Sequence, residues 1–218
     1  MRAAFVGGSS GIGLATARLA VDAGWDVVIL SRDPERADID AVRVALDIAD
    51  EAAVREAFAA LGPVDHLVFS PVARAGGPAK SLDLGAARTA FETKFWGPFA
   101  AVQAAEVRES IVFVSGVAAA TPMRGGSATA AVNGALEALV RTLAVELAPV
   151  RFNAIHPGII SDSPAWSEKK EAIANIEKRT PGGRLATTDD VVGAVDFLFT
   201  NRGVNGINLV IDGGWLLT

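Results

Sequence analysis

Short apolar runs alternate with longer segments of helical periodicity along most of the chain. The runs AAFV, DVVIL and SIVFV, at residues 3–6, 26–30 and 110–114, are continuous and apolar, and they predict buried strands. Segments such as GLATARLAVDAG and EAAVREAFAALG place apolar residues three or four positions apart and predict helices. Buried strands that alternate with helices indicate a parallel sheet covered on both faces.

The same pattern predicts the remaining elements. Strands are expected within residues 3–8, 25–31, 42–48, 65–70, 110–116, 151–158 and 207–214. Helices are expected within residues 13–24, 51–62, 87–106, 127–148, 167–179 and 189–200. Residues 159–185 hold a charged helix between prolines, and we expect this segment to be a mobile cap over a substrate pocket.

Length and composition limit the class of protein. A chain of 218 residues suffices for one α/β core, so we expect a single domain over residues 1–218. The net charge of −5 disfavours nucleic acid or an anionic membrane as partner and favours a small-molecule substrate. With no cysteine and only two histidines, a metal site is not expected. We find no signal core and no apolar run long enough to span a bilayer, and we expect a cytoplasmic protein.

A glycine-rich loop, VGGSSGIG at residues 6–13, follows the first predicted strand and precedes the first predicted helix. Gly7, Gly11 and Gly13 allow a tight turn and let the backbone approach a pyrophosphate at the positive helix end. An NAD-selective site would carry an acid at the end of the second strand, where this chain has Ser31 and Arg32. Because a guanidinium pairs with a 2′-phosphate, these residues favour NADP(H). The alternative is that Arg32 is a solvated surface charge.

Several motifs resemble those of the short-chain dehydrogenase/reductase family over nearly the whole chain. They are VGGSSGIG, ALDIAD with Asp47, AIHPGII, GRLATTDDVVGAVDFLF and VIDGG. The resemblance implies a Rossmann-like, doubly wound α/β domain with a seven-stranded parallel sheet. It also implies that Asp47 contacts the adenine. One departure is FSPV, residues 69–72, where the family usually has two asparagines, an alanine and a glycine.

Laid on the family pattern, these motifs imply a cofactor site that spans the loops at one edge of the sheet. The implied cofactor-binding residues are Gly7, Ser9, Ser10, Gly11, Ile12, Gly13, Ser31, Arg32, Asp47, Ile48, Ser70, Pro71, Ser115, Asn133, Pro157, Gly158 and Ile160.

The family's chemistry uses a tyrosine, a lysine four residues later, a serine and an asparagine, and this chain contains no tyrosine. The resemblance places the tyrosine position at Thr129, the lysine position at Asn133 and the asparagine position at Lys94. The serine position falls on Gly116, directly after Ser115. A threonine hydroxyl is far too weak an acid to replace a phenol.

Lysine and asparagine have exchanged places in this pattern, which suggests how a proton donor is retained. Lys94 would set its ammonium near the reacting centre, while Asn133 hydrogen-bonds the ribose and Ser115 or Thr129 holds a substrate oxygen. Partial desolvation would lower the pKa of Lys94 toward that of a proton donor. The alternatives are that Lys94 is a surface lysine and that Thr129 and Asn133 merely cap or solvate the helix start.

Three function classes remain open from the sequence. The first is an NADP(H)-dependent oxidoreductase acting on a ketone, an activated alkene or an imine. The second is a catalytically inactive NADP(H)-binding module, and the third is a non-redox isomerase or cyclase. Arg74, Lys80 and Arg124 in the loops are candidates to meet an anionic substrate. The family resemblance also suggests a homodimer or homotetramer packed through residues 88–106 and 129–148.

Overall fold

The parallel sheet is the centre of the molecule. Within residues 1–73 and 75–218, which the computed structural model describes, seven strands form one sheet in the order β3-β2-β1-β4-β5-β6-β7. Every neighbouring pair is parallel, so the predicted doubly wound sheet is confirmed. The strands are β1 (Arg2–Val6), β2 (Asp26–Ser31), β3 (Val42–Ala45), β4 (Val64–Phe69), β5 (Val107–Val114), β6 (Arg151–Pro157) and β7 (Asn208–Ile211).

Helices connect the strands. The α-helices are α1 (Gly11–Asp22), α2 (Glu51–Leu61), α3 (Leu84–Phe91), α4 (Gly97–Ala104), α5 (Ser127–Glu146), α6 (Lys170–Glu177) and α7 (Thr188–Thr200). A π-helical segment, Glu92–Trp96, joins α3 to α4, and short 3-10 turns lie in the loops. Among the described residues, no helix is both long enough and apolar enough to cross a membrane.

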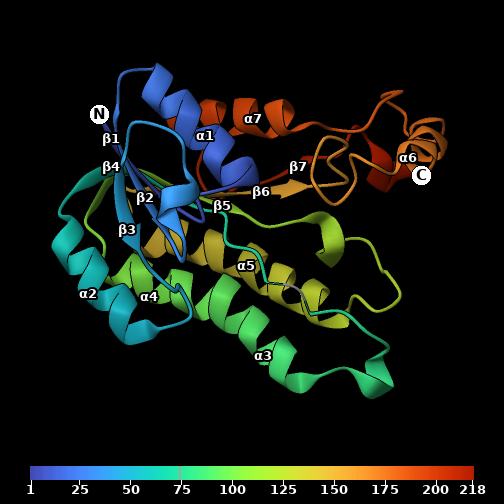
Figure 1. Ribbon diagram of the computed structural model, residues 1–218, viewed down its shortest axis with the longest axis horizontal. Helices are drawn as coiled ribbons and strands as arrows, with labels where there is room; N and C mark the ends of the chain where they lie inside the picture. Colours follow the sequence, from blue (N-terminus) through green and yellow to red (C-terminus); the bar gives the residue numbers. More distant parts are fainter. Residues whose placement is uncertain (74) are drawn as a thin grey trace.

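Successive strand residues enter two different cores because side chains alternate across a sheet. In β1, Ala4 and Val6 pack into one core while Ala3 and Phe5 pack into the other. The first core takes the buried faces of α2, α4 and α5, and the second takes those of α1 and α7. Figure 1 shows α1 and α7 along one face of the sheet and α2, α4 and α5 along the other. Both faces of the strands are therefore covered, which explains their continuous apolar sequence.

The predicted single helix over residues 87–106 is wrong in detail, because the segment changes its hydrogen-bond register. Pro98 has no N–H to donate to the carbonyl of Lys94, four residues earlier. The Gly97 N–H instead donates to the carbonyl of Glu92, a five-residue step that defines the π-helical turn. The helix also ends at Ala104, before the predicted end, because the next residue is extended.

The strand order creates a crevice. β1 is paired with β2 on one side and with β4 on the other, so the connections after β1 and β4 leave in opposite directions. Ligands of open α/β sheets bind at such a switch point, beyond the carboxyl ends of the strands. The residues between β6 and α7, which include α6, lie at this end of the sheet (Figure 1).

Candidate active site and cofactor cleft

An open cleft of about 950 Å³ runs along the carboxyl ends of β1, β2, β4, β5 and β6. It extends from the loop after β2 to the segment that follows β6. The sequence-predicted residues that line it are Gly7, Ser9, Ser10, Gly11, Ile12, Gly13, Ser31, Arg32, Asp47, Ile48, Ser70, Pro71, Lys94, Ser115, Pro157, Gly158 and Ile160. The structure therefore gathers residues from six loops into one continuous surface.

The glycine-rich loop packs closely against the end of β4. A Cβ atom on Gly7 would lie 2.9 Å from the carbonyl carbon of Ser70, and Gly7 has a φ of +79°. A Cβ atom on Gly13 would collide with the Ser70 hydroxyl oxygen. These positions admit glycine alone. The first turn of α1, which begins at Gly11, lines the cleft. An α-helix supplies no partner for its first-turn N–H groups, so they can bind an anion.

The end of β2 presents a basic, hydroxyl-bearing surface. The Ser31 hydroxyl oxygen is buried and has no hydrogen-bond partner among the described residues. The exposed side chains of Arg32 and Arg36 line the cleft beside it, together with Asp33. Asp47, which follows the neighbouring strand β3, accepts a hydrogen bond from the Ala49 N–H at 3.0 Å. An unpartnered hydroxyl beside two guanidinium groups fits a phosphate.

The two exchanged positions are in direct contact. The Lys94 Nζ donates a hydrogen bond to Oδ1 of Asn133 at 3.0 Å, although 39 residues separate them. Asn133 is buried, and its Nδ2 donates to the carbonyl of Gly116 at 3.0 Å. Asn133 does not line the cleft formed by the described residues; Lys94 does, from the π-helical segment. Asn133 thus lies behind Lys94 and orients its ammonium.

The environment of Lys94 changes its acidity. Burial lowers the pKa of Lys94 from 10.5 to about 8, because the ammonium loses hydration. Among the described residues, no carboxylate forms an ion pair with it. The lysine is therefore protonated at neutral pH, yet a much stronger acid than a solvated lysine.

Ser115 and Thr129 have different surroundings. The Ser115 hydroxyl oxygen is buried at the cleft wall with no hydrogen-bond partner among the described residues. The Ser115 N–H donates to the carbonyl of Ile155 at 2.8 Å, which holds the residue at the end of β5. The Thr129 hydroxyl instead donates to the carbonyl of Ala75 at 3.3 Å. Within the described chain, Ser115 lines the cleft and Thr129 does not.

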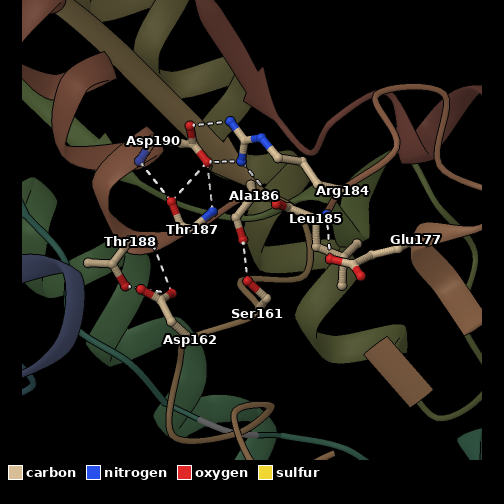
Figure 2. Close-up of polar contacts among 9 residues, drawn as sticks. All are labelled: Ser161, Asp162, Glu177, Arg184, Leu185, Ala186, Thr187, Thr188 and Asp190. Atoms are coloured by element: carbon tan, nitrogen blue, oxygen red, sulfur yellow. Dashed lines mark hydrogen bonds and ion pairs between the residues drawn. The ribbon is translucent and has the colours of Figure 1, made fainter. Parts of the chain in front are cut away.

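The segment after β6 is fastened to the start of α7, as Figure 2 shows. Ser161 donates to the carbonyl of Ala186, and Asp162 accepts hydrogen bonds from the N–H and hydroxyl of Thr188 at 2.9 and 3.0 Å. Arg184 donates two hydrogen bonds to Asp190, at 2.6 and 2.8 Å. These contacts tie both ends of the predicted cap to one helix terminus.

The sequence did not single out several cleft residues. Thr93, which precedes Lys94, and Ser163, which follows β6, line the cleft, as does Arg36, which follows β2. Arg36 lies four positions after Arg32, and this pairing was a usable signal for a phosphate site. Lys80 and Arg124 are exposed and do not line the cleft within the described residues, and Arg74 lies outside the described residues.

Comparisons with known proteins show extensive similarity. A family model described as enoyl-(acyl carrier protein) reductase matches residues 6–216. L-xylulose reductase of Mus musculus is 32% identical, with 100% of this chain and 97% of the relative covered. A crystal structure of a small-chain dehydrogenase in complex with NADPH is 29% identical with a TM-score of 0.86, covering 100% and 99% of the two chains. A structure described as a short chain dehydrogenase/reductase family protein is 32% identical with a TM-score of 0.89, covering 100% and 98%.

Proposed function

The chain belongs to the short-chain dehydrogenase/reductase family, and from this premise we propose that it is an NADP(H)-dependent oxidoreductase in which Lys94 donates the proton. Its substrate is a small ketone, activated alkene or imine. The observation that carries the proposal is the contact of Lys94 with Asn133 at 3.0 Å, at a cleft where burial lowers the pKa of the lysine to about 8. With no tyrosine in the chain, Lys94 replaces the phenol as the acid.

The cleft residues fit a phosphorylated dinucleotide. The glycine cradle and the first turn of α1 suit a pyrophosphate. The unpartnered Ser31 hydroxyl, with Arg32 and Arg36, suits a 2′-phosphate and favours NADP(H) over NAD(H). When bound, the nicotinamide supplies or accepts the hydride. A dinucleotide in this cleft is also in keeping with the NADPH complex of the similar small-chain dehydrogenase.

The protein's own residues complete the reaction by moving one proton. In the reducing direction, the Lys94 ammonium gives its proton to the carbonyl oxygen of a ketone or to the nitrogen of an imine. For an activated alkene, the proton goes to the carbon of the double bond that does not receive the hydride. The neutral amine then regains a proton from water. The buried Ser115 hydroxyl, which is unpartnered among the described residues, donates a hydrogen bond to the substrate heteroatom. Asn133 holds the Lys94 amine in place throughout.

The cap gives the pocket its apolar wall. Ile160 and Trp166 line the cleft at the end where Lys94 and Ser115 lie. Thr93 and Ser163, which carry hydroxyl groups, line the same cleft. A small, fairly apolar substrate with one polar group suits this mixture.

The test is NADPH consumption, followed at the nicotinamide absorbance, over a panel of ketones, enones and imines. Lys94→Met should reduce turnover at least about a hundredfold, as expected for loss of general acid catalysis, while NADPH binding by titration is retained. Lys80→Met, an exposed lysine, is the matched control and should behave as wild type. Turnover in the reducing direction should fall as the pH rises through about 8, because Lys94 loses its proton.

Two results would overturn this proposal. Turnover that is unchanged in Lys94→Met would exclude Lys94 as the proton donor. Tight NADPH binding without consumption over the whole panel would instead favour the binding module, and conversion of a substrate with NADPH conserved would favour the isomerase or cyclase.

A further inference from the structure

A series of hydrogen bonds through Gly116 and Asn133 links the side chain of His156 to that of Lys94. Its Nδ1 lies 3.2 Å from the carbonyl oxygen of Gly116, and its Nε2 lies 3.0 Å from Oδ1 of Asn208. The same Gly116 oxygen accepts the hydrogen bond from Asn133, which in turn accepts the bond from Lys94. His156 is 2% exposed and lies outside the lining of the cleft in the described chain. It therefore reaches the site through its neighbours and does not touch a substrate directly.

The hydrogen-bond partners of the His156 ring indicate which of its two nitrogens carry protons. A main-chain carbonyl only accepts, so Nδ1 of His156 must donate to Gly116. Asn208 donates from its Nδ2 to the main-chain carbonyl of Glu137 at 3.2 Å, so its Oδ1 is the atom that faces Nε2. Both ring nitrogens thus face acceptors. Only the doubly protonated imidazolium satisfies both contacts.

A counter-charge lies beside this ring. Oε1 of Glu137, on α5, is 3.7 Å from Nδ1 of His156, and the Glu137 side chain is 30% exposed. The contacts from β7 and from the end of β5 come from the neutral groups of Asn208 and Gly116. Among the described residues, Glu137 is thus the charged group in contact with the ring, and Lys94 is linked to the ring through three successive hydrogen bonds.

We propose that His156 is a positioning residue, held as an imidazolium by Glu137. Its ring clamps the Gly116 carbonyl, and this carbonyl fixes the amide of Asn133. The amide then sets the position and acidity of the Lys94 ammonium. The significance of this clamp for catalysis rests on the proposed function, in which Lys94 is the acid. The clamp itself is a property of the folded chain and can be measured without turnover.

Gly116 is a suitable place for such a clamp. It has an extended backbone, with φ of 163° and ψ of 159°, and lacks the side chain that would restrict its peptide. It directly follows Ser115, so a rotated Gly116 peptide would disturb both the Ser115 hydroxyl at the cleft wall and the Asn133 amide that lies behind Lys94. A neutral His156 could donate only one of its two hydrogen bonds, and the tautomer that keeps the proton on Nε2 would release the Gly116 carbonyl and free this peptide to move.

Nuclear magnetic resonance of the two histidines tests the protonation state. The chain has only His66 and His156, so labelled histidine gives two ring signals. Burial lowers the pKa of His66 to about 4, which makes it a neutral internal reference. We expect protons on both ring nitrogens of His156 at pH 7 in the wild-type protein, as the two acceptor contacts require, and a proton on only one of them in Glu137→Gln under the same conditions. A neutral His156 ring at pH 7 in the wild-type protein overturns the proposal.

The titration of Lys94 tests the positioning role. Its amine signal is assigned by its disappearance in Lys94→Met. We expect the midpoint of this titration to move in His156→Phe and Glu137→Gln, and to return toward the wild-type value in His156→Gln, which keeps a donor for Gly116. A midpoint that is identical in all these proteins overturns the positioning role even if His156 is charged. Because Glu137 is partly exposed, its variant remains informative if His156→Phe does not fold.

Enzyme kinetics distinguish a failure of the His156 clamp from a failure of the proposed catalytic activity. With an active substrate, His156→Phe should lower kcat about tenfold or more and change the KM for NADPH less than about twofold, because Lys94 is displaced and the dinucleotide residues are not. A protein that turns over no substrate refutes the proposed function, while the two titrations still decide whether the clamp exists.

Discussion

Replacing Lys94 with methionine should stabilise the folded protein at neutral pH while it removes catalysis. The reason is that the folded chain holds an ammonium in a poorly hydrated place. Burial lowers the pKa of Lys94 from 10.5 to about 8, so the unfolded chain binds this proton more tightly than the folded chain. Below pH 8 the charged lysine therefore costs the folded state about 3 kcal/mol.

The pH dependence has a definite sign. As the pH rises from 8 to 10.5, the folded protein releases the proton while the unfolded chain keeps it, so the cost disappears and stability rises. Methionine has no such proton. Between pH 7 and pH 10, wild type should gain about 2.5 kcal/mol of unfolding free energy relative to Lys94→Met. Loss of the hydrogen bond to Asn133 costs the variant about 1 kcal/mol at every pH and leaves this difference unchanged.

The assay is urea unfolding of wild type and variant at several pH values, followed by tryptophan fluorescence, since the chain has four tryptophans. Comparison with the variant removes the contributions of all other titrating groups. Lys80→Met controls for the loss of a cation and should change stability by less than about 0.5 kcal/mol at pH 7, because Lys80 is exposed. A gap between wild type and Lys94→Met that stays constant from pH 7 to pH 10 would refute the reasoning.

Three further predictions concern the cofactor cleft and the cap. Gly13→Ala should destabilise the fold by about 1–3 kcal/mol and weaken NADPH binding, since the new methyl group collides with Ser70; unfolding and titration measure the two effects. Arg32→Glu should weaken NADPH binding at least about tenfold and leave NADH binding less affected, which paired titrations would show. Asp190→Asn should destabilise the protein by about 1 kcal/mol at pH 7, because Asp190 caps α7 and pairs with Arg184. The hydrogen bond from Arg184 lowers the pKa of Asp190, so this difference should persist down to about pH 4 and then shrink steadily as stronger acid protonates the carboxylate in the folded chain, which chemical unfolding at pH 7 and at a series of pH values below 4 would reveal.

Much of the fold was predictable because its signals are local. Strands such as β1 and β5 are continuous apolar runs, and a strand buried on both faces needs no longer-range information to be recognised. The change of hydrogen-bond register between α3 and α4 was harder to predict. Residues 97–98 contain its cause, a proline without an N–H, but the apolar periodicity that indicates a helix continues through them.

Part of the candidate site followed from the sequence in the same way. The glycine loop was identified because only glycine accepts its backbone angles and its close contacts, and this requirement is visible in the residues themselves. The roles of Lys94 and Asn133 were inferred as an exchange between two positions of the family pattern. The structure places Nζ of Lys94 in a direct hydrogen bond with Asn133, a contact that the exchange alone did not specify.

The sequence by itself determined the order of strands and helices and the position of the phosphate-binding turn. It also determined which residues follow the carboxyl ends of the strands. These depend on side-chain polarity, periodicity and backbone freedom, which are properties of short segments. Only the tertiary structure decided which polar groups meet. It left the Ser31 and Ser115 hydroxyls without partners among the described residues, and it made Gly116 the shared acceptor of Asn133 and His156. Such pairings depend on the packing of elements 17 to 40 residues apart, which no local pattern specifies.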